Sequence, residues 1–412
     1  MASIQPVSWH EVKLLSVIMF VALCGMLGVD IHLASLPHIM TYLHTDKTHM
    51  QQSISLFLLG LGGSLLFYGP LSDRYGRKPL VIIGMTFAIV TSVMCAFSTS
   101  IQTFLLLRLC QGIGSGVCMG LGRTMVADLL QGARLAAIGS YFALGISLSP
   151  LIAPTLGGYI QHGLGWQANF IVLGGILTLA LVLYSVICPE TNQHLNKQAV
   201  TMQGLYHNYA ALLSHAAFIR VTLMAGVGLA ISMVFATLSA FIFQNQFHLS
   251  PITYGWLITV VGIGAFLGKL ICPFLIARIG SHQTLGAGLS ILFLAAIALI
   301  VLVAIQQVTV FFITLIAFVC LVSQSLIIPN ALALALSAFP EKRGAAGALY
   351  GSLQMLFAFV SSAVVGLFSN NGVAALAMMY GVLGVMGILL FNRLPHHDPL
   401  VTQATEPKKR SL

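Results

Sequence analysis

Long stretches without a charged residue constrain this 412-residue chain more than any other feature. No Asp, Glu, Lys or Arg occurs within residues 48–72, 79–107, 135–189, 221–268, 279–340 or 344–392. A helix needs about 20 apolar residues to cross the hydrocarbon core of a bilayer, so several stretches are long enough for two spans. With 58% hydrophobic residues, the chain carries more apolar side chains than a water-soluble core could hide. The sequence therefore predicts an all-α polytopic membrane protein.

Turn signals and charges divide the chain into twelve predicted transmembrane helices. They cover residues 14–36, 51–71, 79–98, 102–124, 134–160, 166–188, 217–243, 252–275, 283–305, 309–331, 344–369 and 373–392. An even count places both termini on one side, and that side then receives nearly all the Lys and Arg residues between spans, with Lys47 opposite. Because positive charge marks the cytoplasmic side, both termini are predicted to be cytoplasmic.

The longest polar segment between spans lies in the middle of the chain, at residues 189–216. It predicts a cytoplasmic linker between an N-terminal six-helix bundle at 1–188 and a C-terminal six-helix bundle at 217–392, followed by a cytoplasmic tail at 393–412. Two bundles related as parallel repeats are an architecture of secondary transporters, which bind their substrates near the middle of the membrane.

An internal repeat supports this division. The segment "GSLLFYGPLSDRYGRKPL" from 63 is similar to "LGKLICPFLIARIGSHQTL" from 267. Aligning Gly76 with Gly280 also pairs Arg74 with Arg278, whereas Ala277 stands in the second copy where Asp73 stands in the first. The first copy is thus the more charged of the two.

The first copy of the repeat lies in the loop between spans two and three. Its fixed positions are Gly69, Asp73, Arg74, Gly76, Arg77 and Lys78. A positive-inside loop with tight-turn glycines would explain the basic residues, but not an acid within the basic cluster. The pattern resembles, at every fixed position, the loop signature of the major facilitator superfamily. That resemblance implies a cytoplasmic gate in which Asp73, Arg77 and Asp128 form a charge latch, with Asp73 facing the start of span eleven.

Span four contains "RLCQGIGSG", with Arg108 about six residues inside the span, where a charge costs at least about 3 kcal/mol. Snorkelling to the outer surface is the alternative to a functional role. Proton-coupled members of the superfamily carry a similar Arg–Gln–Gly pattern. The resemblance therefore implies that Arg108 and Gln111 take part in proton coupling or substrate binding.

Span one ends in "VDIHLASLP", and Asp30 is the acid of the first half that falls within a span. A water-exposed helix end is one possible position for it, whereas continuation of the span to Leu36 would keep it inside. The segment is similar to the end of span one in bacterial drug-resistance transporters of the bicyclomycin and chloramphenicol type. We predict that Asp30 is the proton carrier, because an ionised carboxylate in an apolar site is disfavoured.

Span five contains "SLSPLIAPTLGGY", in which Pro150, Pro154, Gly157 and Gly158 resemble the antiporter signature of the superfamily. The match is partial, because Ser140, Ser149 and Ala153 stand where that signature has glycine. Close helix packing alone would also favour small residues here. The resemblance implies an exporter rather than an importer.

Together these motifs predict a proton-coupled multidrug efflux antiporter of the major facilitator fold. It would export small amphipathic compounds, contribute to antibiotic resistance and lie as a monomer in the bacterial inner membrane. The alternatives are a dedicated siderophore or metabolite exporter and a proton-coupled importer. Its expected partners are the solute, protons and the lipid bilayer.

Other classes of function have less support in the residues. An enzyme would need an acid–base or metal constellation, and the nine acids lie almost entirely at loops. The histidines at 32, 38, 44 and 49 are not spaced as metal ligands usually are. We therefore predict no enzymatic activity, no cofactor, no metal and no nucleic-acid partner. Lys269, within span eight, is predicted to snorkel to the cytoplasm rather than to bind substrate.

Overall fold

The computed structural model describes residues 9–130, 134, 138–139, 142, 144–192, 195, 209–339, 343–368 and 371–394, and these ranges contain helices and no strand. The first half contains α1 (Trp9–Asp30), the short 3-10 helix η1 (Leu33–Ser35), α2 (Leu36–Tyr42), α3 (Lys47–Tyr75), α4 (Arg77–Ala96), α5 (Ile101–Leu129), α7 (Leu148–Leu164) and α8 (Trp166–Ile187). The second half contains α10 (Ala216–Phe241), the π-helical turn η2 (Ile242–Gln246), α11 (Pro251–Ala304), α12 (Val310–Ser337), α13 (Arg343–Leu367) and α14 (Val373–Asn392).

The helices account for the twelve predicted spans. Ten described helices are long and apolar enough to cross a membrane. One of them, the 54-residue α11, leaves the helical conformation at Gly280 and therefore holds two spans. α7 has 17 described residues, because the predicted span 134–160 begins in a part of the chain that is mostly outside the described ranges. With α11 counted as two spans and α7 added, the total is the predicted twelve.

Helix starts follow ordinary capping chemistry. The side chains of Asp46, Ser100, Ser250 and Thr309 each accept a hydrogen bond from the backbone N–H three residues further on, at the starts of α3, α5, α11 and α12. The first span is longer than predicted: it continues through η1 and α2 to Tyr42. Pro37 does not end it, because it lies in the first turn of α2, where a missing N–H breaks no helical hydrogen bond.

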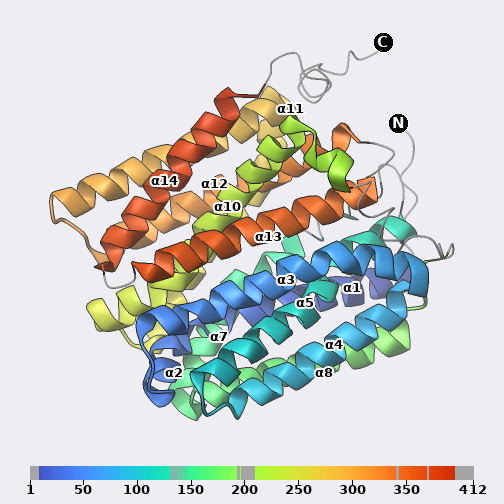
Figure 1. Ribbon diagram of the computed structural model, residues 1–412, viewed down its shortest axis with the longest axis horizontal. Coiled ribbons are helices and arrows are strands. Elements are labelled where there is room, and N and C mark those ends of the chain that lie inside the picture. The colour runs from blue at the N-terminus through green and yellow to red at the C-terminus, as the bar shows by residue number, and fades with distance from the viewer. Residues whose placement is uncertain are drawn as a thin grey trace.

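The helices form two bundles that lie side by side (Figure 1), α1 to α8 in one and α10 to α14 in the other. Within the first bundle α5 packs against α3, α4 and α1, and within the second α11 packs against α12 and α10 against α13. Between the bundles, α3 packs along α13 and α7 packs along α11. These two helix pairs form most of the interface on which any movement between the bundles depends.

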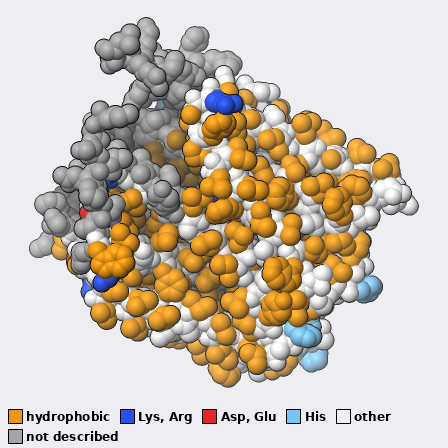
Figure 2. All heavy atoms as spheres, turned by 180° about the vertical axis from the view of Figure 1, so that it is seen from behind, with side chains coloured by type: hydrophobic (Ala, Val, Ile, Leu, Met, Phe, Trp, Pro, Cys, Tyr) orange, Lys and Arg blue, Asp and Glu red, His pale blue; other side chains and the backbone are white. Residues whose placement is uncertain are grey.

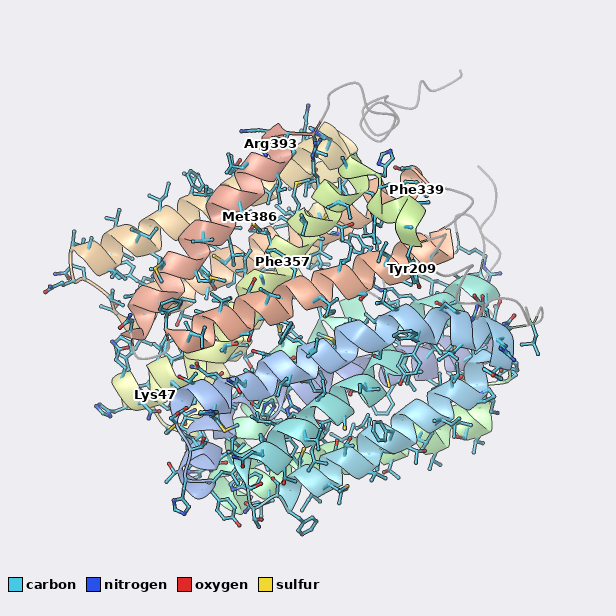
Figure 3. All side chains as sticks on the ribbon, viewed as in Figure 1. Lys47, Tyr209, Phe339, Phe357, Met386 and Arg393 are labelled. Carbon is cyan, nitrogen blue, oxygen red and sulfur yellow. The ribbon has the colours of Figure 1, made fainter. Side chains whose placement is uncertain are left out.

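Lys47 lies at one end of the helices, and Tyr209, Phe339 and Arg393 lie toward the other (Figure 3). We call these the Lys47 end, predicted to face away from the cytoplasm, and the Arg393 end, predicted to be cytoplasmic. Apolar side chains cover most of the face between them, with Lys and Arg near one end and histidines near the other (Figure 2). This is the surface expected of a protein solvated by lipid.

Burial differs strongly between helices. α10 is enclosed: 94% of the residues in its most apolar segment are buried, whereas the corresponding value for both α8 and α11 is 33%. The core of the second bundle is thus built around α10.

All seven cysteines are free thiols: six are buried, and Cys110 on α5 is partly exposed.

Candidate functional site

A network of charged side chains joins α3, α4 and α5 at the Arg393 end. Arg77, the first residue of α4, is buried; its Nη1 donates to Asp73 Oδ1 at 2.6 Å and its Nε to Asp128 Oδ2 at 3.2 Å. Nη1 also donates to Ser72 Oγ. One guanidinium therefore binds carboxylates from two other helices, which is a strong form of charged hydrogen bonding. The structure brings together the three residues predicted to form the latch.

Glu190, which the sequence analysis did not single out, completes this network. Its two carboxylate oxygens accept hydrogen bonds from the backbone N–H groups of Arg77 and Lys78, each at 2.9 Å. These N–H groups have no partner within α4 and lie at the positive end of its dipole. Gly76 makes the approach possible, because a Cβ at that position would lie 2.5 Å from Glu190 Oε2. Glu190 therefore ties the segment after α8 to the start of α4.

The side chains of Lys78 and Arg74 and the position of Gly69 lie outside the carboxylate network. Lys78 Nζ donates to the carbonyl oxygen of Ser185 at 2.9 Å, which links α4 to α8. Arg74 is exposed and stacks over the ring of Tyr75, 5.0 Å from its centroid. Gly69 faces the second bundle, because a Cβ there would lie 4.0 Å from that of Ala348 on α13.

Contact between the latch and the rest of the chain involves Tyr209, which precedes α10. Its hydroxyl donates to the carbonyl oxygen of Leu66 on α3 at 2.9 Å and lies near enough to Asp73 to interact with its charge. We predict that Asp73 faces the start of α13. The residues directly before α13, 340–342, lie outside the described ranges, so this contact stays a prediction. The described hydrogen bonds of Arg77 all remain within the first bundle and the segment that follows it.

Arg108 is fully buried inside the first bundle, on α5. Its Nη1 donates to the carbonyl oxygen of Gly28 at 3.0 Å and to Gln111 Oε1, and its guanidinium stacks over Phe57 at 4.5 Å. Gln111 in turn donates to Ser92 Oγ on α4 at 2.5 Å. The guanidinium is therefore held among α1, α3 and α5 instead of reaching the membrane surface.

Asp30 is the last residue of α1 and is 7% exposed. Ser149 Oγ on α7 donates to its Oδ2 at 2.7 Å. Because the first span runs on to Tyr42, Asp30 lies inside the span rather than at a water-exposed end. Asp30 and Arg108 do not form an ion pair; Arg108 instead binds the carbonyl oxygen of Gly28, two residues earlier in α1.

The two glycines of the partial antiporter motif lie where α7 meets other backbone. A Cβ on Gly157 would lie 1.9 Å from the carbonyl oxygen of Ile31, in the first span. A Cβ on Gly158 would lie 2.5 Å from the carbonyl oxygen of Pro251, at the start of α11. Side chains larger than hydrogen cannot occupy either position without displacing these segments.

α11 contributes matching glycines to the same interface. A Cβ on Gly255 would lie 2.7 Å from the carbonyl oxygen of Pro154, and one on Gly262 would lie 2.8 Å from that of Pro150. The hydroxyls of Thr155 and Thr259 hydrogen bond to each other at 2.7 Å between these contacts. Pro150, Pro154 and Gly158 therefore form a close backbone contact between the two bundles, whereas Gly157 packs within the first bundle.

In the parts of the chain that the structure describes, no three His, Cys, Asp or Glu side chains come together as a cluster that could hold a metal ion. His32 is buried beside Phe170, with ring centroids 5.6 Å apart, and is not part of a ligand cluster.

Two bundles of membrane-spanning helices, joined near the middle of the chain and meeting along paired helices, define the class of secondary transporters. Residues 18–241 and 221–412 each match the sequence profile of the Major Facilitator Superfamily. The chain belongs to the Major Facilitator Superfamily.

Several curated relatives match most of the chain. The multidrug resistance protein MdtL of Shewanella oneidensis is 26% identical over 382 residues, which cover 92% of this chain and 95% of the relative. The bicyclomycin resistance protein homolog of Haemophilus influenzae is 24% identical and covers 88% and 91%, and multidrug resistance protein D of Escherichia coli K12 is 25% identical and covers 94% and 98%.

Solved structures confirm the fold. The D-xylose-proton symporter superposes with a TM-score of 0.76 at 16% identity, over 93% of this chain and 98% of the symporter. The human organic anion transporter MFSD10 superposes with a TM-score of 0.70 at 17% identity, over 94% of this chain and 99% of that one.

Proposed function

We propose that the protein is a proton-coupled antiporter that exports small amphipathic compounds, drugs among them, across the bacterial inner membrane. In this proposal residues 1–188 and 217–392 are the two moving bundles, 189–216 is the linker, and both termini and the tail from 393 are cytoplasmic. The names of the relatives, which describe multidrug and bicyclomycin resistance, support this function. The protein works as a monomer and uses no cofactor.

The observation that carries the proposal is the hydrogen bond between Asp30 and Ser149. It joins the embedded acid of the first span to α7, the helix that packs closely against α11 of the other bundle. A carboxylate enclosed in an apolar span without a counter-charge is costly when ionised, so proton binding stabilises this closed arrangement. Loss of the proton weakens it and favours separation at the α7–α11 contact. Proton binding and bundle movement are thereby linked.

Arg108 and Gln111, which lie on α5, support this linkage between proton binding and bundle movement. Because Arg108 binds the carbonyl oxygen of Gly28, it fixes the segment of α1 that leads to Asp30. The network around Arg77 acts at the other end of the first bundle, where it holds α3, α4 and α5 together as one body. Movement then occurs between bundles rather than within the first one.

The test replaces Asp30 by asparagine, which keeps the size and removes the titrating proton. We expect proton-driven accumulation of ethidium in inverted vesicles to fall at least about tenfold, an effect of about 1.4 kcal/mol or more on coupling, while downhill exchange remains. Purified wild-type protein should release protons when ethidium is added, and Asp30→Asn should not.

Asp46→Asn is the matched control, because Asp46 is an exposed helix cap at the Lys47 end. It should transport as the wild type does. If Asp30→Asn released as many protons as the wild type, Asp30 would not be the carrier. If ethidium moved only in the same direction as the protons, the protein would be an importer.

A further inference from the structure

A cavity of about 530 Å³ lies at the Lys47 end of the protein, beside α2 (Figure 1). Its walls come from α2, the end of α7, the start of α8 and the π-helical turn η2 of the second bundle. Three of the residues that line it, His38, Tyr42 and Asn245, are exposed, so a dissolved compound can reach the cavity. Its volume is within the range of small-molecule binding sites.

Two residues of the cavity wall carry buried polar atoms without partners. Gln161, in the last turn of α7, is 8% exposed, and Trp166, the first residue of α8, is 4% exposed. Within the described part of the chain, neither Gln161 Oε1 nor Trp166 Nε1 has a hydrogen-bond partner. Buried polar groups are nearly always hydrogen-bonded, and a buried indole N–H usually finds an acceptor. The wall therefore offers a ligand one acceptor and one donor.

Backbone and ring packing hold these two residues on the wall. Gly165, with φ 85° and ψ 172°, turns the chain from α7 into α8 and so places Gln161 and Trp166 on either side of one tight junction. The indole of Trp166 packs against the rings of Tyr42 and Phe104, with centroids 5.3 and 6.3 Å apart. The indole is thus enclosed by aromatic neighbours and is not free to turn toward another acceptor.

Membrane anchoring does not explain Trp166. Tryptophans near a membrane surface normally direct the N–H toward water or lipid headgroups. Trp256 on α11 has this character: it is 53% exposed, and its Nε1 donates to the hydroxyl of Tyr159 at 3.4 Å. The N–H of Trp166 is instead enclosed by protein. Its position fits a binding wall better than an anchor.

The chemistry of the cavity selects against charged ligands. Among the described residues that line it there is no Asp, Glu, Lys or Arg. A charge buried here would lose hydration without gaining a counter-charge, which is costly. The lining instead combines aromatic rings with side-chain amides, at Tyr42, Trp166, Gln161, Gln167 and Asn245. These groups suit a flat, uncharged molecule.

We propose that this cavity binds small uncharged aromatic compounds that carry both a carbonyl group and an N–H or O–H group. Trp166 Nε1 donates to the ligand's carbonyl oxygen, and Gln161 Oε1 accepts from its N–H or O–H. The second bundle completes the wall, because Gln244 Nε2 donates to the carbonyl oxygen of Ala34 at 2.9 Å and holds η2, with Asn245, against the first bundle. The inference goes beyond the proposed export function, since binding here requires neither a proton gradient nor Asp30.

The experiment measures binding of aminomethylcoumarin to the detergent-purified full chain by fluorescence polarisation. This dye is an uncharged aromatic lactone with one carbonyl and one amino group. Trp166→Phe and Gln161→Leu should each weaken its binding at least about fivefold, the effect of losing one hydrogen bond of ordinary strength. Trp256→Phe and Gln102→Leu are the matched controls at exposed positions outside the cavity, and they should leave the affinity unchanged. Unchanged binding in both wall variants would overturn the site.

Methylcoumarin, which lacks the amino group, tests the assigned contacts separately. Measured by competition with the first dye, it should bind equally well to the wild type and to Gln161→Leu, and more weakly to Trp166→Phe. If Gln161→Leu weakened both dyes equally, the amide would only shape the cavity, and its assignment as the acceptor would be wrong.

Stability without dye distinguishes binding from a structural role. Because Gln161 Oε1 is buried without a partner in the described chain, Gln161→Leu should leave the unfolding midpoint unchanged or raise it. A clearly lower midpoint would show that the amide supports the fold and would contradict the proposal.

Transport keeps this site apart from the proposed function. If the wild type bound aminomethylcoumarin but exported no ethidium, the site would stand and the export function would fall. If it exported ethidium but bound the coumarin no better than empty detergent micelles do, the site would fall and the antiporter would stand.

Discussion

The two copies of the internal repeat share a backbone turn but not its chemistry. Gly76 has φ 96° and ψ 158°, and Gly280 has φ 82° and ψ 164°, so the two helix junctions use nearly the same glycine conformation. In the first copy this glycine is followed by Arg77 and approached by Glu190. In the second copy Ser281 takes the place of Arg77, and Ala277 takes that of Asp73.

The second copy makes contacts through aromatic rings. His282 lies over Phe391 of α14 with ring centroids 4.8 Å apart, and Arg278 stacks over Phe274 at 4.2 Å. Both copies turn the chain between two spans, so the turn itself needs only the glycine. The ion network of the first copy is therefore an addition to the fold, and we attribute it to gating.

The largest expected difference between the copies comes from removing the central cation. Arg77→Ala leaves Asp73 and Asp128 facing each other and should lower stability by about 2 kcal/mol, less than the roughly 3–5 kcal/mol of a fully buried pair, because both acids remain partly exposed. Ethidium export should largely disappear. Ser281→Ala at the equivalent position should cost less than about 0.5 kcal/mol.

These two variants are compared by thermal unfolding in detergent and by efflux from cells. Equal losses in both would show that the network is an ordinary part of helix packing and would remove the argument for a gate.

A smaller difference is expected at the glycines. Alanine at either position is strained, because this backbone region is nearly restricted to glycine and costs about 1–3 kcal/mol. Gly76→Ala should lose more than Gly280→Ala, since its Cβ also pushes Glu190 away from the start of α4. Unfolding midpoints of the two proteins provide the measurement. A greater loss at Gly280 would mean that the Glu190 contact contributes nothing.

The smallest effect should follow from adding the missing acid. Ala277→Asp places a carboxylate on an exposed position with no arginine four residues later, so its effect on stability should stay within about 0.5 kcal/mol. Ala277→Asp with Ser281→Arg rebuilds the pair and should gain about 0.3–0.5 kcal/mol. Thermal unfolding of the two variants checks this order. A gain well above it would show that the charges stabilise the turn itself.

The spans could be predicted from the sequence because uncharged apolar runs determine them directly. The grouping of Asp73, Arg77 and Asp128 was predicted from the resemblance to the superfamily's loop signature, and the structure adds the direct contact between Asp73 and Arg77. Glu190 was not, because its partner lies 113 residues away and nothing local marks a carboxylate after a span as a helix cap. Lys269 was interpreted wrongly, because snorkelling assumes a lipid-facing side chain, whereas this one meets Ser147 of the other bundle.

Ser149 shows how a departure from a motif can carry information. It stands where the superfamily's antiporter signature has glycine, so the sequence indicated only a weakened match. In the structure the same hydroxyl reaches Asp30, 119 residues earlier. A pattern of small residues predicts that helices approach closely, but it cannot show which side chain lies opposite.

The burial of the cysteines has a consequence for chemical labelling. A water-borne maleimide must reach a thiol to react, and six of the seven thiols are enclosed by protein. Replacing Cys110 by serine therefore gives a nearly silent background without rebuilding the other six sites. Single reporter cysteines placed on α7 and α11 in that background can carry spin or fluorescent labels. The separation of the bundles then becomes a distance that can be followed as protons and solutes are added.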